Sequence, residues 1–391
     1  MTGLRLEIDL DKLYHNARTL VERLDERGMS VTGIVKATLG SPEIARTLLR
    51  GGVSGLGDAR IENIERMRRA GVRGPMTLIR SPMLSQVDRV VAAADVSFNT
   101  ELNVIRSLSA AAVATKRVHG IVLMVELGDL REGIMPADLL DVVRETLRLP
   151  NVMLKGIGTN LACRSGTSPD ARNMAELSAL ACLVEASFDV VLEVVSGGNS
   201  ANIRWAFGTA DHGRINDLRL GEALLLGREA LRRQPIDELH TDAITLVAEV
   251  VESKIKPSQP WGSIAQNAFG EEMDVIDRGR VTQSILALGR QDTDCAGLHP
   301  PPGIEIVGSS SDHLVVLSGE RLTIGGEVRF QLEYGALLRA MTSPFVAKVV
   351  TGATDERAAR PRHSRGLMAI STPSLSAISA AIPADATGPL T

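Results

Sequence analysis

Residues 31–58 read VTGIVKATLGSPEIARTLLRGGVSGLGD, and this stretch decides the fold. Its two ends, VTGIVK and VSGLGD, are short runs of apolar and β-branched residues that predict β-strands. The segment between them has helical spacing, in which Ser41 can cap the first turn, Pro42 takes the first helical position and Gly51 ends the helix. A strand, a helix and a second strand in this order predict one unit of a parallel sheet.

The same alternation of strands and helices continues from about residue 30 to about residue 230. The runs that predict strands are VTGIVK, VSGLGD, MTLIR, DVSFN, GIVLMVEL, MLKGIGTN, VVLEVVS and LRLGEALLLG. Eight such units in about 200 residues favour an α/β fold of the TIM-type (β/α)8 barrel class over an open doubly wound sheet. In such a barrel the loops after the strands build the functional site, so the residues that end these runs are the candidates.

The pattern changes after about residue 240, where strand-like alternation continues without helices, as in AITLVAEVVES, GIEIVGSS, HLVVLSG and EVRFQLEYG. This pattern predicts a second, all-β domain. From Thr351 the chain is rich in Ala, Ser, Thr and Pro and has no periodic apolar face, so we expect a disordered tail. The predicted division is a barrel domain over residues 1–235, a β domain over residues 236–350 and a tail over residues 351–391.

The composition is that of a globular protein with small-molecule partners. Of the 391 residues, 44% are hydrophobic, which is enough for a large core. Lys and Arg total 43 against 47 acidic residues, giving a net charge of -4, and aromatic residues make up only 3%. The sequence therefore offers nucleic acid neither a basic surface nor a set of rings on which bases stack.

Three features lead us to expect a cytoplasmic protein. The three cysteines, Cys163, Cys182 and Cys295, are odd in number and form no CxxC spacing, which argues against a disulfide framework or a zinc knuckle. The first residues, MTGLRLEIDL, carry acids and lack the apolar core of a signal peptide. No run of about 18 apolar residues is present that would span a membrane.

Lys36 stands at the end of the first predicted barrel strand. Desolvation at the rim of an apolar strand disfavours the charged ammonium, and an uncharged lysine is a nucleophile for an aldehyde. The alternative is a lysine whose head group extends to water.

Two later segments carry candidate ligands. The strand pattern before SGGNSAN ends in two glycines, and Asn199 and Ser200 then offer donors at a helix start. This arrangement can cradle a phosphate, although it can also be an ordinary capped turn. Arg219 lies in a predicted strand, where its permanent charge needs an acceptor, either a ligand or the nearby Asp217 or Glu222.

Other catalytic signatures are missing from the sequence. It contains no HExxH, Walker, GxSxG or GxGxxG motif. The seven histidines lie without ligand spacing. We therefore expect no metal site.

Six fragments in chain order carry a resemblance to a known family: IDLDKLYHN, VKA, VELGDLREGI, GTNLAC, SGGNSAN and LRLGEALLLG. Together they resemble the alanine/ornithine racemase family, whose members are fold-type III enzymes that use pyridoxal 5'-phosphate (PLP). The resemblance covers about residues 4–350. It implies a PLP-binding barrel, a C-terminal β domain and amino-acid racemisation by proton abstraction at Cα.

The resemblance implies roles for three charged barrel residues. Lys36 matches the lysine that forms a Schiff base with PLP, and Arg219 matches the arginine that contacts the pyridine nitrogen. A permanently charged guanidinium keeps that nitrogen unprotonated, which favours racemisation over transamination, whereas decarboxylases of this fold carry a glutamate there. Arg131 matches the arginine that approaches the cofactor phenolate and the substrate carboxylate.

Further cofactor ligands follow from the same matching. Ser200, Gly221 and Glu222 match phosphate-binding positions, the last two through their backbone N–H groups. Asn160 stands where alanine racemases carry a histidine near the ring, and Asn199 of the glycine-rich loop is an additional candidate.

The resemblance leaves the second catalytic base unidentified, because alanine racemases use a tyrosine of the partner chain and the matching stretch SIAQNAFG contains none. In the β domain, GSSSDH and LALGRQDTD match segments that face the substrate. They make Ser311 and His313 catalytic candidates and Asp292, Asp294 and Asp312 substrate-binding candidates, although a hairpin turn has the same composition. Several acids would suit the distal ammonium of ornithine or lysine better than they suit alanine.

Three other interpretations remain open at this stage. A basic amino-acid decarboxylase of the same fold would need an acid at position 219, and a non-catalytic PLP-binding homeostasis protein would lack the C-terminal domain. A barrel that binds another phosphorylated ligand would carry no PLP. The family resemblance also implies a homodimer, in which the β domain of one chain completes the barrel site of the other.

Overall fold

The computed structural model describes residues 3–272 and 276–352. The predicted barrel is confirmed: eight parallel strands close on themselves in chain order. These strands are β2 (Ser30–Ile34), β3 (Gly55–Asp58), β4 (Met76–Leu78), β5 (Val96–Asn99), β6 (His119–Met124), β7 (Val152–Gly158), β8 (Val194–Ser196) and β9 (Asp217–Leu220). Each lies within or beside one of the eight runs that the sequence analysis assigned to a strand.

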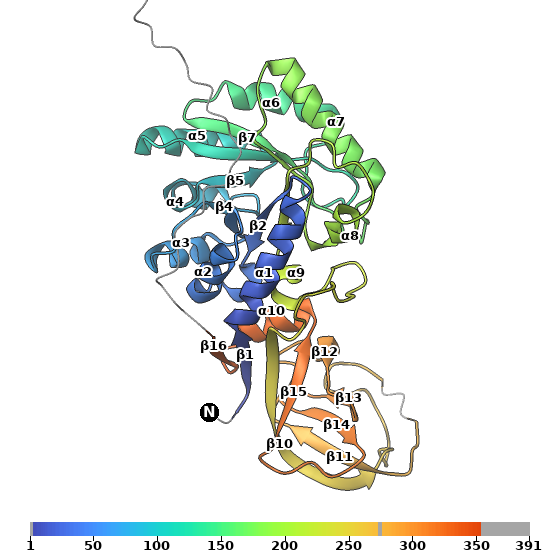
Figure 1. The fold of residues 1–391 in the computed structure, drawn as a ribbon. Coiled ribbons are helices and arrows are strands. Elements are labelled where there is room, and N and C mark those ends of the chain that lie inside the picture. Colours follow the sequence, from blue (N-terminus) through green and yellow to red (C-terminus); the bar gives the residue numbers. More distant parts are fainter. Residues whose placement is uncertain (1–2, 273–275, 353–391) are drawn as a thin grey trace, which may run out of the picture. The chain divides into compact units, whose positions relative to one another are not determined.

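The helices follow the strands and surround the barrel (Figure 1). They are α1 (Leu10–Asp25), α2 (Pro42–Arg50), α3 (Ile61–Arg69), α4 (Val87–Ala93), α5 (Leu102–Thr115), α6 (Leu139–Leu147), α7 (Ala171–Phe188), α8 (Ile203–Ala206) and α9 (Glu222–Leu226). Short 3-10 turns also follow some of the strands, and two of them carry candidate residues: η1 (Lys36–Thr38) after β2 and η4 (Ser200–Asn202) after β8. Both turns therefore lie at the end of the barrel where the strands finish.

Helix α2 shows why this sequence forms these elements. The Ser41 Oγ accepts the backbone N–H of Ile44 at 3.4 Å, Pro42 is the first helical residue and Gly51 follows the last, as predicted. The apolar side chains Ile44 and Leu48, one helical turn apart, are fully buried. Their burial fixes α2 against the strands on either side of it.

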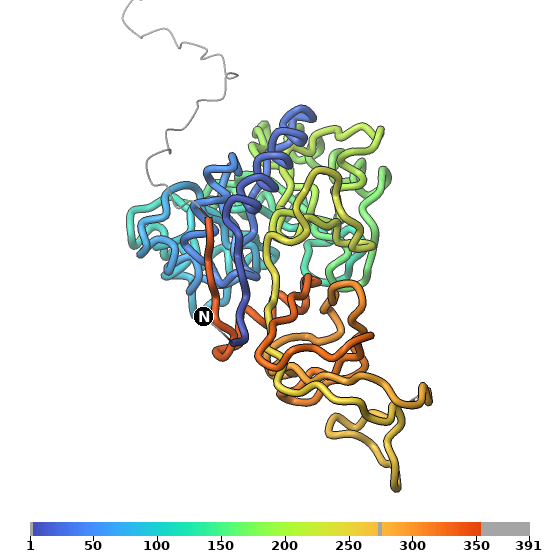
Figure 2. The backbone as a smooth tube through the Cα atoms, turned by 60° about the horizontal axis from the view of Figure 1, so that its bottom comes forward, coloured from blue at the N-terminus to red at the C-terminus, as the bar shows by residue number. Residues whose placement is uncertain are grey.

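The C-terminal region forms the predicted antiparallel β-sheet, ordered β12-β15-β10-β11-β14-β13. Its strands are β10 (Ile244–Pro257), β11 (Arg280–Leu286), β12 (Leu298–His299), β13 (Ile304–Ser309), β14 (Leu314–Ser318) and β15 (Glu327–Leu332). The first strand of the chain, β1 (Arg5–Asp9), pairs with β10 and also with β16 (Ala347–Thr351). Figure 2 shows β16 beside β1, although the two lie at opposite ends of the described chain.

Two segments differ from the predicted elements. The run LRLGEALLLG is a strand only as far as Leu220, and its second half is helix α9. All of the apolar residues of that half are buried, and a fully buried run has no periodicity that distinguishes a helix from a strand. The run EVRFQLEYG ends as a strand at Leu332, and the unpredicted helix α10 (Tyr334–Thr342) begins within it.

The proposed boundaries at residues 235 and 350 stay a prediction. Residues 353–391, most of the predicted tail, lie outside the described residues. Among the helices that the structure describes, none is long and apolar enough to cross a membrane.

Candidate active site

Lys36 is the first residue of η1, directly after β2, at the end of the barrel where the strands finish. The residue is half-buried, and its Nζ lies 5.9 Å from the centre of the Tyr334 ring. Within the described ranges its side-chain amine forms no hydrogen bond and no ion pair. The structure therefore places a primary amine at the barrel end and gives it no fixed partner.

Tyr334, the first residue of α10, was not found from the sequence. Its hydroxyl is buried and has no hydrogen-bond partner among the described residues. Burial raises the pKa of this hydroxyl, and the negative charges of Glu222 and Asp58 raise it further. A buried, protonated phenol without a partner can donate a hydrogen bond to a ligand that offers an acceptor.

Asp58 is a second residue that the sequence analysis missed. It ends β3, the strand next to β2, and is fully buried. Burial raises the pKa of its carboxyl group to about 6, although the positive charge of Lys36 acts in the opposite direction. An acid at the end of a barrel strand was a visible signal in VSGLGD.

Arg219 lies inside the barrel and is 4% exposed. Its two terminal nitrogens donate to the Ser196 Oγ at 2.6 Å and to the Thr159 backbone oxygen at 2.6 Å, and its guanidinium lies 5.0 Å from the centre of the Phe98 ring. The Ser196 hydroxyl in turn donates to Asp217. Arg219 thus reaches Asp217 through a serine, and burial lowers its pKa to about 10.

This network leaves two of the five N–H donors of Arg219 available, the one on Nε and one on the nitrogen that binds Ser196, among the described residues. The other terminal nitrogen also makes a long contact of 3.4 Å with the Asn160 Oδ1. The Asn160 Nδ2 is buried and has no partner there either. Two neighbouring residues therefore each have donors that lack acceptors.

The glycine-rich loop after β8 forms a compact cap. The Ser200 Oγ accepts the backbone N–H groups of Gly221 and Ala223 at 3.4 and 3.1 Å. The Asn199 Nδ2 donates to the Asn160 Oδ1 at 3.0 Å, which connects the loops after β7 and β8. Gly198 is required here, because it has a φ of 144° and a Cβ on it would lie 2.2 Å from the Asn202 Oδ1.

Glu222 follows Gly221 and is the first residue of α9. Burial raises the pKa of its carboxyl group to about 7, and Glu333 and Glu229 raise it further, whereas Arg233 and Arg228 lower it. The N–H groups on either side of Glu222, those of Gly221 and Ala223, donate to the Ser200 Oγ, so this segment lies beside the glycine-rich loop.

Arg131 lies in the loop after β6, is exposed and pairs with Glu132. The Glu126 carboxylate fixes this loop by accepting the backbone N–H groups of Gly128 and Leu130 at 2.6 and 3.0 Å. Arg131 is near enough to Arg219 that its positive charge lowers the pKa of Arg219. It therefore lies at the same end of the barrel.

The β-domain candidates form a separate group. The Asp312 Oδ1 lies 2.9 Å from the His313 Nδ1 and accepts the Ser311 hydroxyl at 3.1 Å, and His313 lowers the pKa of Asp312. Asp292 is buried and accepts the Gly289 N–H at 3.0 Å, whereas Asp294 caps a short turn by accepting the Ala296 N–H at 3.3 Å. The two loops are joined by the backbone, since the Gln291 N–H donates to the Ser311 oxygen at 3.0 Å.

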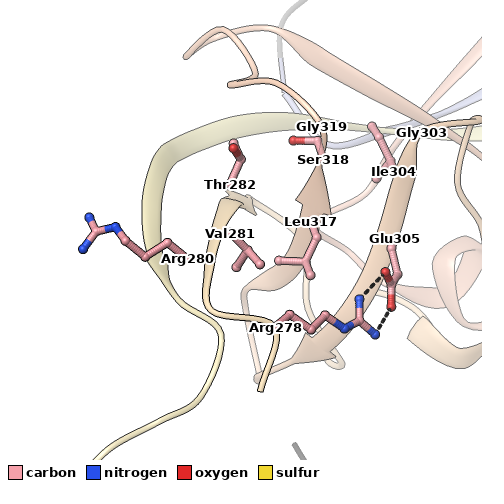
Figure 3. A pocket seen from close by; sticks show the side chains of 10 residues that line it. All are labelled: Arg278, Arg280, Val281, Thr282, Gly303, Ile304, Glu305, Leu317, Ser318 and Gly319. Carbon is pink, nitrogen blue, oxygen red and sulfur yellow. Dashed lines mark hydrogen bonds and ion pairs between the residues drawn. The ribbon is translucent and has the colours of Figure 1, made fainter. Parts of the chain in front are cut away.

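No hydrogen bond or ion pair joins this group to Lys36, Arg219 or the glycine-rich loop within the described residues. Within one chain the candidates thus form two hydrogen-bonded groups, one at the barrel end and one in the β-domain loops, although Asp294 lies beside α10: a Cβ on Gly335, the residue after Tyr334, would lie 3.1 Å from its Oδ2. A hollow of about 600 Å³ between β11, β13 and β14 contains neither group. Figure 3 shows that Arg278 and Glu305 pair across one side of it.

Residues 8–229 match the family model of the alanine racemase N-terminal domain, a match that spans more than half of the chain. The chain belongs to the alanine racemase family. The family resemblance carried by the six fragments is therefore confirmed.

Two curated relatives extend this match to nearly their whole length. The lysine racemase of Thermotoga maritima is 38% identical over 352 residues, which cover 88% of this chain and 98% of that protein. The ornithine racemase of Acetoanaerobium sticklandii is 38% identical over 354 residues, with the same coverage of both chains. These relatives identify this member of the family as an amino-acid racemase, an isomerase, and favour it over the decarboxylase and the non-catalytic carrier.

Solved structures with the same fold include the alanine racemase of Streptomyces lavendulae, with a TM-score of 0.70 and 21% identity over 90% of this chain and 98% of that chain. The D-threonine aldolase of Filomicrobium marinum gives a TM-score of 0.69 with 15% identity, over 87% of this chain and 91% of that chain. At this level of identity the likeness concerns the fold, and it confirms the barrel followed by a β domain.

Proposed function

We propose that this racemase holds pyridoxal 5'-phosphate on Lys36 and interconverts the L and D forms of a basic amino acid, ornithine or lysine. The observation that carries the proposal is the primary amine of Lys36 at the barrel end, half-buried and without a partner among the described residues. When bound, PLP draws electron density away from the substrate Cα and so weakens its bond to hydrogen.

The residues around Lys36 fit this cofactor. A phosphate group needs donors, and Ser200 with the backbone N–H groups of Gly221 and Glu222 supplies them at one place. The Tyr334 hydroxyl is buried and has no partner among the described residues. Its ring lies 5.9 Å from the Lys36 Nζ, and the negative charge of Glu222 raises its pKa, so this hydroxyl would donate to the same phosphate. A bound phosphate would therefore accept a hydrogen bond from a hydroxyl that has no acceptor among the described residues.

Arg219 and Asn160 would contact the ring of the cofactor. The free Nε of Arg219 would donate to the ring nitrogen and, being permanently charged, would keep that nitrogen unprotonated. The hydrogen bonds to Ser196 and Thr159 fix the guanidinium plane for this contact. Asn160 adds an unpartnered amide donor, and Asn199 holds Asn160 in place.

Lys36 and Arg131 would act on the substrate. Once its amine is released from the cofactor, Lys36 can remove or return the proton at Cα from one face. The exposed guanidinium of Arg131 pairs with Glu132, the next residue in the chain. A substrate carboxylate could replace the Glu132 carboxylate as its partner. Ser311 and His313 are the candidates for proton transfer at the opposite face.

A distal ammonium of the substrate would face acids of the β domain. The two relatives matched over 98% of their length are a lysine and an ornithine racemase, which supports a basic substrate. Of the three candidate acids, Asp312 and Asp294 are exposed, whereas the buried Asp292 carboxylate accepts the Gly289 N–H within its own turn. We therefore assign the ammonium to Asp312 and Asp294 first.

The two separate groups support a homodimer with shared active sites. Asp312 and its neighbours do not contact Lys36 within the described part of one chain, so the β-domain loops of a partner chain would complete the site. Ser311 and His313 would then act from the partner. We also infer a cytoplasmic location, because the three cysteines form no disulfide.

The decisive test is the Lys36→Ala variant, with Lys155→Ala as a matched control. Lys155 also lies on a barrel strand, β7, but pairs with Glu193 at 2.7 Å. We expect Lys36→Ala to lose both the visible absorbance of bound PLP and the racemisation of L-ornithine and L-lysine, measured by chiral chromatography. The control keeps both. Full activity in Lys36→Ala would refute the proposal.

A further inference from the structure

Asp217 lies inside the barrel, farther from the candidate site than Arg219. The two are the first and third residues of β9, and side chains two positions apart on a strand point to the same face. Arg219 is the nearer of the two to the end of the barrel where the strands finish. Asp217 is 5% exposed and Arg219 is 4% exposed. The same strand therefore buries an acid and a base in the barrel interior.

The two charges are connected by a single side chain. Arg219 donates to the Ser196 Oγ at 2.6 Å and to a backbone oxygen, both of which are uncharged acceptors. Asp217 accepts three hydroxyl groups: its Oδ1 accepts those of Thr32 at 2.8 Å and Ser30 at 3.4 Å, and its Oδ2 accepts that of Ser196. Neither charge forms an ion pair with a described residue. Among these residues, Ser196 alone is hydrogen-bonded to both side chains.

The charges decide the direction of both hydrogen bonds at Ser196. A carboxylate can only accept and a guanidinium can only donate, whereas a hydroxyl does both. The Ser196 hydroxyl therefore gives its one proton to Asp217 and turns a lone pair toward Arg219. Hydrogen bonds in such a chain polarise one another, so the negative charge of Asp217 strengthens the bond that holds the guanidinium.

The acid also offsets part of the cost of burying Arg219. A buried charge is expensive unless an opposite charge or hydrogen bonds compensate it. Burial lowers the pKa of Arg219 to about 10, and the negative charge of Asp217 is the largest influence that raises it again. The hydrogen bonds and the charges thus agree in linking Asp217 to Arg219.

We propose that Asp217 is a positioning residue for Arg219: acting through the Ser196 hydroxyl, it fixes the plane of the guanidinium whose free Nε is assigned to the ring of the cofactor. The inference rests on the proposed role of Arg219 and deepens it. The side-chain contacts of Asp217 are with hydroxyl groups of the barrel wall, so it acts only through its neighbours. A guanidinium that turns out of this plane loses its aim at the ring, and reactivity depends steeply on such aim.

Two variants and one matched control separate this role from simple packing. Ser196→Ala removes the connection and keeps both charges. Asp217→Asn keeps the Oδ1 that accepts Thr32 and Ser30, but it replaces the acceptor of the Ser196 hydroxyl by an amide donor. The control is Thr32→Val, because Thr32 donates to the same carboxylate and forms no hydrogen bond with Arg219 among the described residues.

The first measurement is a double-mutant cycle by urea unfolding of the cofactor-free, full-length protein. Asp217→Asn should raise the equilibrium constant for unfolding in the parent, and in an Arg219→Met background its effect should be roughly tenfold smaller, because the guanidinium is gone. Ser196→Ala should show a smaller effect in the same background, and it decides the cycle if Asp217→Asn does not fold. Thr32→Val should have the same effect in both backgrounds. Equal effects of Ser196→Ala or Asp217→Asn in both backgrounds would overturn the inference.

The second measurement follows the products with PLP bound. In Ser196→Ala and Asp217→Asn, the fraction of turnovers that end in pyridoxamine phosphate should rise roughly tenfold, since a misdirected guanidinium no longer keeps the ring nitrogen unprotonated. Thr32→Val should match the parent. A parental fraction in both variants would reduce Asp217 to a stabilising residue and overturn the inference. Full activity in Lys36→Ala would instead refute the proposed function and the assignment of Arg219 to the cofactor, whereas the coupling measured without cofactor would stand.

Discussion

The carboxyl group of Asp58 should make the protein less stable as the pH rises through the acidic range. Its pKa is about 6 in the folded protein, whereas an aspartate in an unfolded chain has an ordinary pKa of 3.8. Below the lower value both states hold the proton, and between the two values only the unfolded chain releases it. The destabilisation therefore grows over this interval and is complete above about pH 6.

The size of the effect follows from the shift. Each unit of pKa corresponds to about 1.4 kcal/mol, so a shift of roughly two units costs the folded state about 3 kcal/mol at neutral pH. Asp58→Asn removes this cost but buries an amide group without a partner, which costs about 1 to 3 kcal/mol at every pH. The pH-independent part cancels when the variant is compared with the parent at two pH values.

The assay is urea unfolding of the cofactor-free protein at about pH 4.5 and about pH 7.5, a span over which roughly two-thirds of the titration effect develops. The free energy of unfolding of Asp58→Asn, measured relative to that of the parent, should be about 2 kcal/mol larger at the higher pH, which means that the variant is relatively more stable there. Asn63→Ala is the comparison variant: it removes a hydrogen bond that lowers the pKa of Asp58, so it should cost more stability at the higher pH, the opposite trend to Asp58→Asn. If the difference between Asp58→Asn and the parent is the same at both pH values, the carboxyl group has no raised pKa and the reasoning fails.

Four further outcomes follow from the site. Arg219→Glu should lower racemisation roughly 100-fold and increase transamination, seen as pyridoxamine phosphate in the product mixture, because a glutamate lets the ring nitrogen take a proton; an unchanged product ratio would remove the electronic argument. Glu222→Gln should tighten PLP binding by about 1 kcal/mol, roughly fivefold, above about pH 7 and have little effect below about pH 6. The reason is that the Glu222 carboxyl group is anionic only at the higher pH, where it would repel the phosphate. Equilibrium dialysis at both pH values checks this. Asp312→Asn should reduce kcat/KM for ornithine by about 1.5 to 3 kcal/mol, tenfold or more, and leave that for alanine nearly unchanged, whereas equal losses would mean that Asp312 does not bind the side chain. Mixing Lys36→Ala with Asp312→Asn should restore part of the activity if one site takes residues from two chains, and no restoration despite demonstrated subunit exchange would place both residues in one chain's site.

The fold could be predicted because its signals are local. The cap, the first-turn proline and the terminal glycine of α2 lie within one short segment, and the strand runs on either side contain β-branched residues. The prediction failed at α9, where Ala223 and Leu224–Leu226 are all buried. A segment that is buried on every side carries no amphipathic period, so its type is decided by the space between the barrel and its neighbours.

The candidate site could be predicted only where one segment carries both the side chain and its context. Lys36 follows its own strand within two residues, and the glycine-rich loop contains Ser200 and its turn in one fragment. Tyr334 carried no such signal, because it belongs to a helix that was not predicted and approaches Lys36 only through the tertiary fold. The missing partner of Asp58 Oδ2 is likewise a property of packing, since Asn63 satisfies one oxygen and nothing satisfies the other.

A buried polar atom without a partner points to function more strongly when its free-energy cost to the fold is larger. His119 has a buried nitrogen without a partner, but its other ring nitrogen bonds to the Ser97 hydroxyl at 2.8 Å, and burial lowers its pKa to about 4. The imidazole is therefore uncharged at neutral pH, and its unpaired nitrogen costs the fold about 1 to 3 kcal/mol, as any buried polar atom does. Asp58 differs because at neutral pH its buried oxygen carries a charge, which costs the folded state about 3 kcal/mol, whereas an asparagine would replace that charge by an unpartnered amide at about 1 to 3 kcal/mol. Packing therefore gives no reason to prefer the acid to the amide, and its place at the end of the barrel where Lys36 also lies favours a functional role.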